Sequence, residues 1–264
     1  STIQDDSKYA DIIKSVPNYS DYYAISDEIS YILPSSHTFY NDLKQLVKRM
    51  DINIFYEDLK CVYIDDAGNK ELLDTINDVY YKSDFSFWKS YDVIIKFCTK
   101  MMEGLHFLHE RKICHLDIKP ENIMVNTLTS KFKLIDFGFS SKEPFDDYVS
   151  NIRGTPNYFP KHFKISRITP WLPKITAIDF IMINGVLPIV NNRQLVYKID
   201  SYCFGRVLYF LKYIYTENAT YCCFNWEKNA GLKLDKIINS LIDDNIHTRL
   251  TIKDCFELYF NRNY

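Results

Sequence analysis

The stretch HLDIKPEN at residues 115–122, followed by DFG at residues 136–138, decides how the rest of this chain is interpreted. The first stretch carries a carboxylate, an amine and a carboxamide on Asp117, Lys119 and Asn122, and DFG adds a second carboxylate. A carboxylate can accept a proton from a reacting group, and carboxylate and amide oxygens are ligands that Mg²⁺ prefers. Together the two stretches predict a site where a proton acceptor lies beside a hard cation.

Phosphoryl transfer is the chemistry that needs this combination of groups. It requires a group that accepts the proton of the attacking hydroxyl, and oxygen ligands for the metal that bridges the nucleotide phosphates. Asp117 is the candidate for the first role, and Asn122 and Asp136 are the candidate metal ligands. Lys119 can offset charge on the transferred phosphoryl group. A lone Asp in such a position would more often be a buried or capping residue, so the joint pattern carries the hypothesis.

These motifs resemble those of the protein-kinase family, whose catalytic loop reads H-R-D-x-K-x-x-N and whose metal loop reads D-F-G. The form D-x-K-P-E-N is typical of serine/threonine kinases of the eukaryotic type. The resemblance implies an α+β, protein-kinase-like fold with a mainly helical large lobe and a small lobe that contains strands. It also implies ATP and Mg²⁺ as cofactors, and a protein substrate with a serine or threonine acceptor.

Other stretches extend the resemblance from about residue 5 to the C-terminus. GTPNYFP at residues 154–160 is similar to the substrate-facing end of the activation segment, which implies that Thr155 contacts the catalytic Asp and Lys. DSYCFG at residues 200–205 is similar to the start of a buried helix whose Asp holds the backbone of the catalytic loop. Arg249 matches an arginine near the end of the large lobe.

The nucleotide base is expected between the lobes. Residues 63–76 resemble the hinge and the helix that follows it, so the resemblance places Tyr63 and Gly68 beside the adenine. Met124 is expected in the apolar floor below it. The predicted division is therefore a reduced or partial small lobe with the hinge at residues 1–68, and a large lobe at residues 69–264.

The front of the chain departs from the family. No glycine precedes Gly68 and no V-A-I-K strand is visible, so the usual contacts above the phosphates are missing from the pattern. Either the chain is a fragment, or it is a reduced kinase that uses other contacts. We expect weak binding of ATP unless Lys8, Lys14 or an activating partner replaces those contacts.

Three further departures concern regulation and packing. Leu116 replaces the Arg that normally pairs with a phosphate on the activation segment, so activity is expected not to depend on phosphorylation there. Lys161 stands where the family has Glu, which deprives Arg249 of its expected partner. The chain between residues 162 and 198 is longer than the family needs and is predicted to carry an insertion.

Two alternatives remain open at this point. One is a pseudokinase or interaction module that keeps the fold without efficient transfer, and the other is a small-molecule kinase of the same fold. Intact Asp117, Asn122 and Asp136 argue against the first, and DFG followed by Gly154 and Thr155 argues against the second. The compositional style is also similar to that of kinases of large DNA viruses.

Composition excludes several other classes of protein. The formal net charge is -2, so no basic field predicts a nucleic-acid or membrane partner. The most apolar stretch, residues 175–190, is interrupted by polar residues and is too short to span a bilayer. Seven cysteines without framework spacing predict free thiols in a reducing compartment, hence a cytoplasmic protein, in the host cytoplasm or the virion if the source is viral.

Apolar periodicity predicts the main elements. A hairpin is expected from two apolar runs, residues 122–125 and 132–135, that flank a polar turn. The chain beyond Asp200 is expected to be mostly helical. Helices are predicted at residues 9–16, 37–49 and 87–109 and from residue 71 onward, and a strand at residues 59–64.

Overall fold

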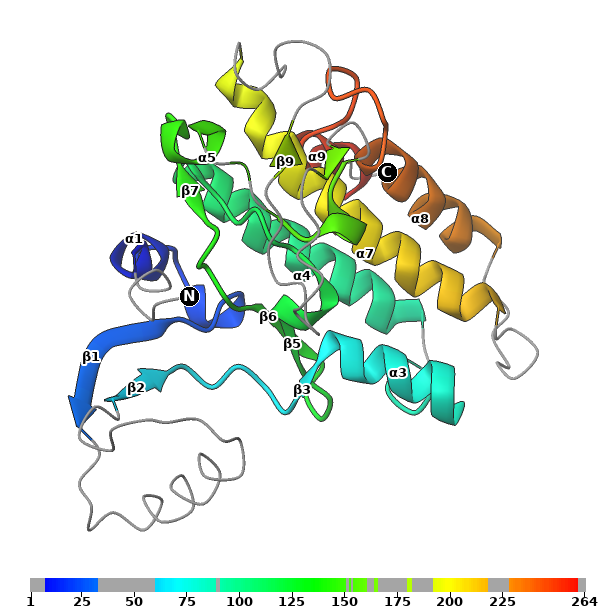
Figure 1. The fold of residues 1–264 in the computed structure, drawn as a ribbon. Helices are drawn as coiled ribbons and strands as arrows, with labels where there is room; N and C mark the ends of the chain where they lie inside the picture. The colour runs from blue at the N-terminus through cyan, green and yellow to red at the C-terminus, as the bar shows by residue number, and fades with distance from the viewer. Residues whose placement is uncertain are drawn as a thin grey trace.

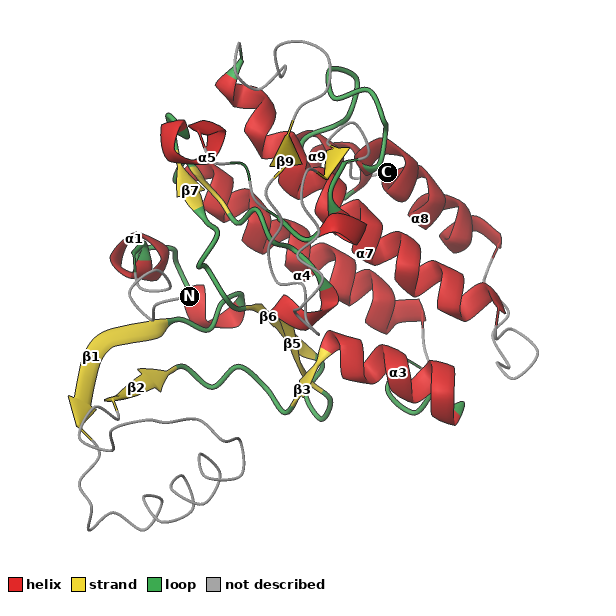
Figure 2. Cartoon of the chain, in the orientation of Figure 1, coloured by secondary structure: helices red, strands yellow, loops and turns green. Residues whose placement is uncertain are grey.

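The computed structural model describes residues 8–32, 60–88, 91–150, 152, 154–160, 164–165, 180–181, 192–217 and 228–260. The helix predicted at residues 37–49 lies outside them. Figure 1 shows a helical body with a small antiparallel sheet of two strands beside it, and Figure 2 shows that helices make up most of the body. The predicted α+β, protein-kinase-like fold is confirmed.

The body is built around two long helices, α4 (Tyr91–Glu110) and α7 (Tyr197–Glu217). The predicted stripe of α4 is buried because its apolar residues recur at helical spacing and face the other helices. Two shorter helices, α8 (Lys228–Leu241) and α9 (Ile252–Tyr259), pack against this pair, and α3 (Leu72–Lys82) packs against α7. The expected helical large lobe around a buried helix starting near Asp200 is thus present (Figure 1).

The predicted hairpin is also present and extends to three strands. The sheet order is β3-β5-β6, with β3 at Lys70–Glu71, β5 at Ile123–Asn126 and β6 at Lys131–Leu134. Its turn is closed by Asn126, whose Oδ1 accepts the backbone N–H of residues 128 and 129. All four described sheets pair antiparallel.

The N-terminal part begins with α1 (Ala10–Lys14) and the 3₁₀ turn η1 (Tyr19–Asp21). The small sheet follows, with β1 (Ser26–Ile32) antiparallel to β2 (Lys60–Ile64). Of these, β1 was not foreseen from the sequence, because its acidic residues obscure the alternation typical of a strand.

The segment between α1 and β1 is fastened to the body. The N–H of Ala24 donates to Leu134 O (3.0 Å), the N–H of Leu134 donates to Tyr22 O (2.8 Å), and Tyr23 is fully buried. The Tyr23 hydroxyl donates to the carbonyl of Gly104 on α4. Residues 8–25 therefore belong to the same core as the body.

The remaining short elements surround the loops of the predicted site. Strand β4 (Ile113–Cys114) pairs with β7 (Ser141–Lys142), and β8 (Lys164–Ile165) pairs with β9 (Phe180–Ile181). The helical elements here are η3 (Pro120–Asn122), α5 (Asp146–Ser150), η4 (Pro156–Tyr158) and η5 (Arg193–Val196). Residues 193–198 of the predicted insertion form η5 and the start of α7; the insertion itself stays a prediction.

Two expectations from composition can be compared with the described residues. The side chains of four of the seven cysteines are described, and Cys98, Cys114, Cys203 and Cys255 are all buried free thiols, as predicted. Among the helices of the described ranges, none combines the length and apolar character needed to cross a membrane.

Candidate active site

The catalytic loop, residues 115–119, is held from beneath by Asp200 of α7. The carboxylate of Asp200 is fully buried and accepts the backbone N–H groups of His115 (2.8 Å) and Leu116 (2.7 Å). Leu116 has a φ of 67°, a left-handed conformation that a branched residue adopts only when its surroundings impose it. The carboxylate satisfies two buried donors and imposes this bend, so the contact implied by the resemblance is confirmed.

His109 of α4 completes the environment of Asp200. Its Nε2 lies 2.9 Å from Asp200 Oδ2, and the thiol of Cys114 is nearby. Both oxygens of Asp200 already accept backbone N–H groups, and burial raises the pKa of the Cys114 thiol well above its ordinary value. A buried carboxylate with hydrogen bonds and a protonated thiol fit a structural anchor and not a metal centre.

Asp117 lies at the centre of a closed group of polar side chains. Its side chain is 5% exposed, and Lys119 Nζ donates to its Oδ2 at 2.7 Å. Thr155 Oγ1 donates to the other oxygen, Oδ1, at 2.6 Å and itself accepts from Lys119 Nζ at 3.2 Å. The predicted contact of Thr155 with Asp117 and Lys119 is therefore confirmed, although the threonine is 38 residues away in the sequence.

Thr155 reaches this position because the chain next to it is tightly packed. A Cβ on Gly154 would lie only 2.5 Å from the ring of Phe159, so a residue with a side chain would displace the segment. Arg206 of α7 also holds the segment, because its Nε donates to the carbonyl of Asn157 at 3.3 Å. The hydroxyl of Thr155 is thereby held against the catalytic loop.

Asn122 and Asp136 are brought together by the register of the β5–β6 hairpin. Ile123 pairs with Leu134, and one step further the N–H of Ile135 donates to Asn122 O at 3.0 Å. Asp136 is the next residue and is exposed. The Nδ2 of Asn122 donates to both Asp117 O (2.9 Å) and Asp117 Oδ2 (3.1 Å), which leaves its Oδ1 for a ligand. An amide oxygen and a carboxylate at one end of a hairpin fit a hard cation such as Mg²⁺.

Phe137 fixes the direction of Asp136. The phenyl ring is 2% exposed and makes edge contacts with Tyr23 (6.0 Å between centroids) and tilted contacts with His115 (4.9 Å). The Nε2 of His115 in turn lies 3.1 Å from the carbonyl oxygen of Ile135. Because the ring is buried between the N-terminal segment and the catalytic loop, the backbone turns Asp136 outward with a φ of 62°.

The first part of the activation segment, the chain between DFG and residues 154–160, is held by a carboxylate. Asp147 of α5 accepts hydrogen bonds from Ser141 and from Lys8, whose Nζ lies 3.3 Å from Asp147 Oδ2. Lys8 also lies over the ring of Tyr9, 5.0 Å from its centroid. One of the two lysines that could have replaced the missing contacts above the phosphates therefore binds the activation segment instead. This contact was not foreseen, because the two residues are 139 positions apart.

The hinge residues are only partly covered by the described side chains. The backbone of Tyr63 lies in β2, and its side chain is outside the description. Gly68 is in the loop after β2, and Met124 is half-buried in β5, opposite Glu71 of β3. The structure thus places Gly68 directly against β5, the strand that carries Met124, while the placement of Tyr63 against a base stays a prediction.

Arg249 is buried and binds carbonyl oxygens. Its Nε donates to Asp243 O (2.8 Å) and its Nη1 to Lys198 O (3.0 Å), while its guanidinium lies over the ring of Tyr202 at 4.7 Å. Nη2 is buried without a hydrogen-bond partner, and burial lowers the pKa of the group. Lys161 lies outside the described residues, so its predicted effect on the partner of Arg249 stays a prediction.

A buried Asp paired with Lys and Thr, an Asn and an exposed Asp at one end of a hairpin, and a catalytic loop held by a buried helix define a kinase-type phosphotransferase site. Comparison with known sequences agrees. The chain belongs to the protein kinase family: the family model described as "Protein kinase domain" matches residues 9–171.

Individual relatives are distant. The chain is 30% identical to serine/threonine-protein kinase 17A of Oryctolagus cuniculus over 102 residues, which is 36% of this chain and 25% of that protein. It is 27% identical to an Aurora kinase of Candida glabrata over 180 residues, 60% of this chain and 47% of the relative. A third relative, the smooth muscle myosin light chain kinase of Gallus gallus, is 33% identical over 109 residues, 38% of this chain and 6% of that protein. In all three alignments the chain spans less than half of the relative's own length.

Proposed function

We propose that this protein kinase transfers the γ-phosphoryl group of ATP to a serine or threonine hydroxyl of a protein. The observation that carries the proposal is the closed group of Asp117, Lys119 and Thr155, in which each side chain hydrogen-bonds to the other two. Such a group holds one carboxylate oxygen at a fixed place and keeps a positive charge beside it.

The proposed reaction uses Asp117 as the base. The hydroxyl oxygen of the substrate attacks the γ-phosphorus, the bond from that phosphorus to the β–γ bridging oxygen breaks, and the hydroxyl proton passes to Asp117. ADP leaves with the electron pair of the broken bond. Lys119 lies 2.7 Å from the base, where its charge can stabilise the transferred group. The hydroxyl of Thr155 orients the carboxylate from the other side.

Asn122 and Asp136 are the residues that would hold Mg²⁺. Mg²⁺, when bound, supplies positive charge to the phosphate oxygens. The fit rests on the donors themselves, because Oδ1 of Asn122 and the carboxylate of Asp136 are hard oxygen ligands close to the base. Phe137 keeps Asp136 turned outward, and the hydrogen bond between Asn122 and Asp117 ties the metal ligand to the base.

We further propose that the base of ATP lies between the hinge near Tyr63 and Gly68 and the apolar side chain of Met124. The proposed division of the chain remains a small lobe with the hinge at residues 1–68 and a large lobe at residues 69–264. The contacts of residues 8–25 with the body support a tight connection between the two parts.

The test is a phosphoacceptor screen with the protein, labelled ATP and Mg²⁺. Peptides that differ only in carrying serine, threonine or tyrosine at one position are compared, and amino sugars and amino alcohols are added as small-molecule acceptors. We expect label on serine and threonine peptides. Label mainly on tyrosine or on a small molecule would contradict the proposed substrate class, and nucleotide binding without any transfer would indicate a pseudokinase.

A further inference from the structure

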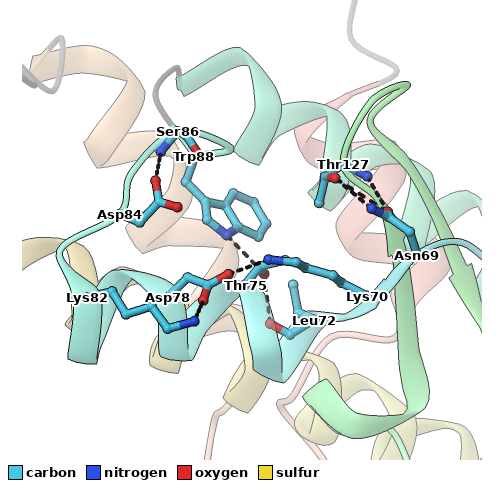
Figure 3. A network of polar contacts seen from close by, with 10 residues as sticks. All are labelled: Asn69, Lys70, Leu72, Thr75, Asp78, Lys82, Asp84, Ser86, Trp88 and Thr127. Atoms are coloured by element: carbon cyan, nitrogen blue, oxygen red, sulfur yellow. Dashed lines mark hydrogen bonds and ion pairs between the residues drawn. The ribbon is translucent and has the colours of Figure 1, made fainter.

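The residue that follows Gly68 in the hinge is fastened to the far end of the β5–β6 hairpin. Asn69 Nδ2 donates to Thr127 Oγ1 at 3.0 Å, and the backbone N–H of Thr127 donates to Asn69 Oδ1 at 2.9 Å. Figure 3 shows the two side chains meeting across the space between the hinge and the hairpin turn. The same carboxamide donates and accepts, so its orientation is fixed at two points. We call this pair, Asn69 with Thr127, the hinge clamp.

The backbone on either side of the clamp leaves little freedom. The N–H of Asn69 donates to Val125 O at 3.0 Å, which begins the pairing of β3 with β5. Gly68 has a φ of 131°, and a Cβ there would lie 2.7 Å from Val125 O. A glycine is required because the hinge backbone lies directly against β5. Asn69 is thus held twice, by side-chain bonds to Thr127 and by a backbone bond to Val125.

A second contact holds the hinge at Asp66, three residues before Asn69. Lys133 of β6 donates from its Nζ to the carbonyl of Asp66, and the side chain of Asp66 accepts the N–H of Gly68 at 3.1 Å. The hinge therefore contacts both strands of the hairpin. Further along the chain, Lys70 binds Asp78 of α3 at 2.6 Å, which continues the attachment into the next helix (Figure 3).

The hairpin that the clamp grips also carries the predicted ligands. Met124 lies in β5, two residues after Asn122, and Asp136 lies two residues after the end of β6. The distance between the bound adenine and the two metal ligands is consequently set by one sheet, provided that the hinge does not shift along that sheet. A shift of about 1 Å at a binding element is enough to cost binding or rate substantially.

We propose that Asn69 and Thr127 are positioning residues for the adenine of ATP: the hinge clamp fixes the hinge relative to Met124 and so sets the width of the base site. This inference rests on the proposed function, because it takes the hinge to be the place where the base binds. It assigns to two polar surface residues a role in nucleotide affinity, without contact to the reacting atoms.

The experiment measures adenosine and Mg·ATP binding by calorimetry, together with transfer rates, for Asn69→Ala and Thr127→Val. Adenosine has no phosphates, so its affinity reports the base site alone. We expect both ligands to bind about threefold to tenfold more weakly in each variant, the range for a lost hydrogen bond. The kcat at saturating ATP should stay within about twofold of the wild type, because the clamp does not touch the catalytic loop.

Two controls separate positioning from general stability. Thr127→Ser keeps the hydroxyl and should restore wild-type affinity. Thr129→Val makes the same chemical change two residues further along the turn, at an exposed position, and should leave affinity unchanged. Thermal unfolding of each variant is measured beside binding, and a drop in affinity that follows only the unfolding temperature would overturn the proposal.

The outcomes distinguish the clamp from the proposed function. If the wild type binds adenosine but phosphorylates no protein, the proposed function fails while the variants still test the clamp. If the wild type transfers phosphate and Asn69→Ala binds adenosine as tightly as the wild type, the clamp fails and the function stands. A wild type that binds no adenosine overturns the role of the clamp as well.

Discussion

The catalytic loop and the hinge both end at the β5–β6 sheet, but they are held there by different means. The catalytic loop is fixed by Asp200, a fully buried carboxylate that accepts two backbone N–H groups. The hinge is fixed by Asn69 and Thr127, whose hydrogen bonds are exposed to solvent. In the first region water cannot replace a lost bond, and in the second region it can.

This difference implies a gradient of sensitivity across the site. A buried donor left without a partner costs about 1–3 kcal/mol, whereas an exposed one is satisfied by water. We therefore expect changes near Asp117, the proposed base, to affect folding and chemistry strongly. Changes at the hinge should alter nucleotide affinity moderately and leave the chemical step intact.

The largest effect on stability is expected for Asp200→Ala. The change leaves the N–H groups of His115 and Leu116 without an acceptor and removes the group that imposes the left-handed bend. We expect a loss of about 3 kcal/mol or more in the free energy of unfolding. Urea denaturation followed by circular dichroism measures it.

The matched control is Asp146→Ala, which removes a carboxylate that is 71% exposed and pairs with Arg193 at the surface. Such a pair contributes at most about 1 kcal/mol. If both variants lose the same free energy of unfolding, burial does not distinguish the two regions.

The next largest effect is on transfer and concerns Thr155. In Thr155→Val, Asp117 and Lys119 lose the hydroxyl that joins them, and the carboxylate is no longer held from both sides. The loss of a hydrogen bond to a charged group corresponds to a fall of about tenfold to a hundredfold in kcat. Steady-state kinetics with a serine peptide measures it.

Thr155→Ser serves as the control, since it keeps the hydroxyl and should stay close to the wild type. A valine variant with normal kcat would show that the hydroxyl is not needed to orient the base.

Removal of phosphate from the activation segment is expected to change activity by less than about twofold. Leu116 is buried and offers no charge to a phosphate, and Asp147 already supplies a negative charge that binds Lys8. Two serines of this segment are also protected from modification, because Ser140 is 2% and Ser141 0% exposed. The assay compares transfer before and after phosphatase treatment, with mass spectrometry to verify removal. Loss of most activity would contradict the expectation.

The smallest effect is expected at Asp78, below the hinge. Hydrogen bonds from Lys70, and then from Lys82, hold the pKa of Asp78 below its ordinary value. Folding favours the ionised form of Asp78. Its contribution to the free energy of unfolding is therefore complete above the ordinary pKa of about 3.9, and it is lost as the pH falls through the lower pKa of the folded protein.

Asp78→Asn should therefore lower the unfolding temperature by only about 1–2 °C at neutral pH, and the difference should shrink in acid. Differential scanning calorimetry at pH 7 and below pH 4 measures it. A difference that stays constant or grows as the pH falls would show that the ion pairs are not its cause.

The parts of the site that could be predicted from the sequence are those with local spacing or family motifs. Asp117, Lys119 and Asn122 lie within one short loop, so their proximity follows from the chain itself. The contacts of Thr155 and Asp200 with that loop were predictable only from the resemblance to protein kinases. Helices α3 and α4 and the β5–β6 hairpin followed from apolar periodicity, which burial preserves in the sequence.

Polar pairs between distant segments were not predictable. Lys8 and Asp147 are 139 positions apart, and Asn69 and Thr127 are 58 apart. Surface Lys, Asp, Asn and Thr residues occur throughout the chain, and no periodicity or spacing marks the ones that meet. Only the three-dimensional arrangement of the hinge, the hairpin and the activation segment identifies them.

The central claim, that Asp117 is the base of a serine/threonine kinase, is tested most directly with Asp117→Asn. Transfer of label from ATP to a serine peptide is measured for the variant and the wild type at equal ATP occupancy, with affinity determined separately. The account predicts that transfer is abolished while Mg·ATP affinity stays nearly intact, because the base acts only in the chemical step. Undiminished transfer, or a loss of binding as large as the loss of turnover, would contradict it.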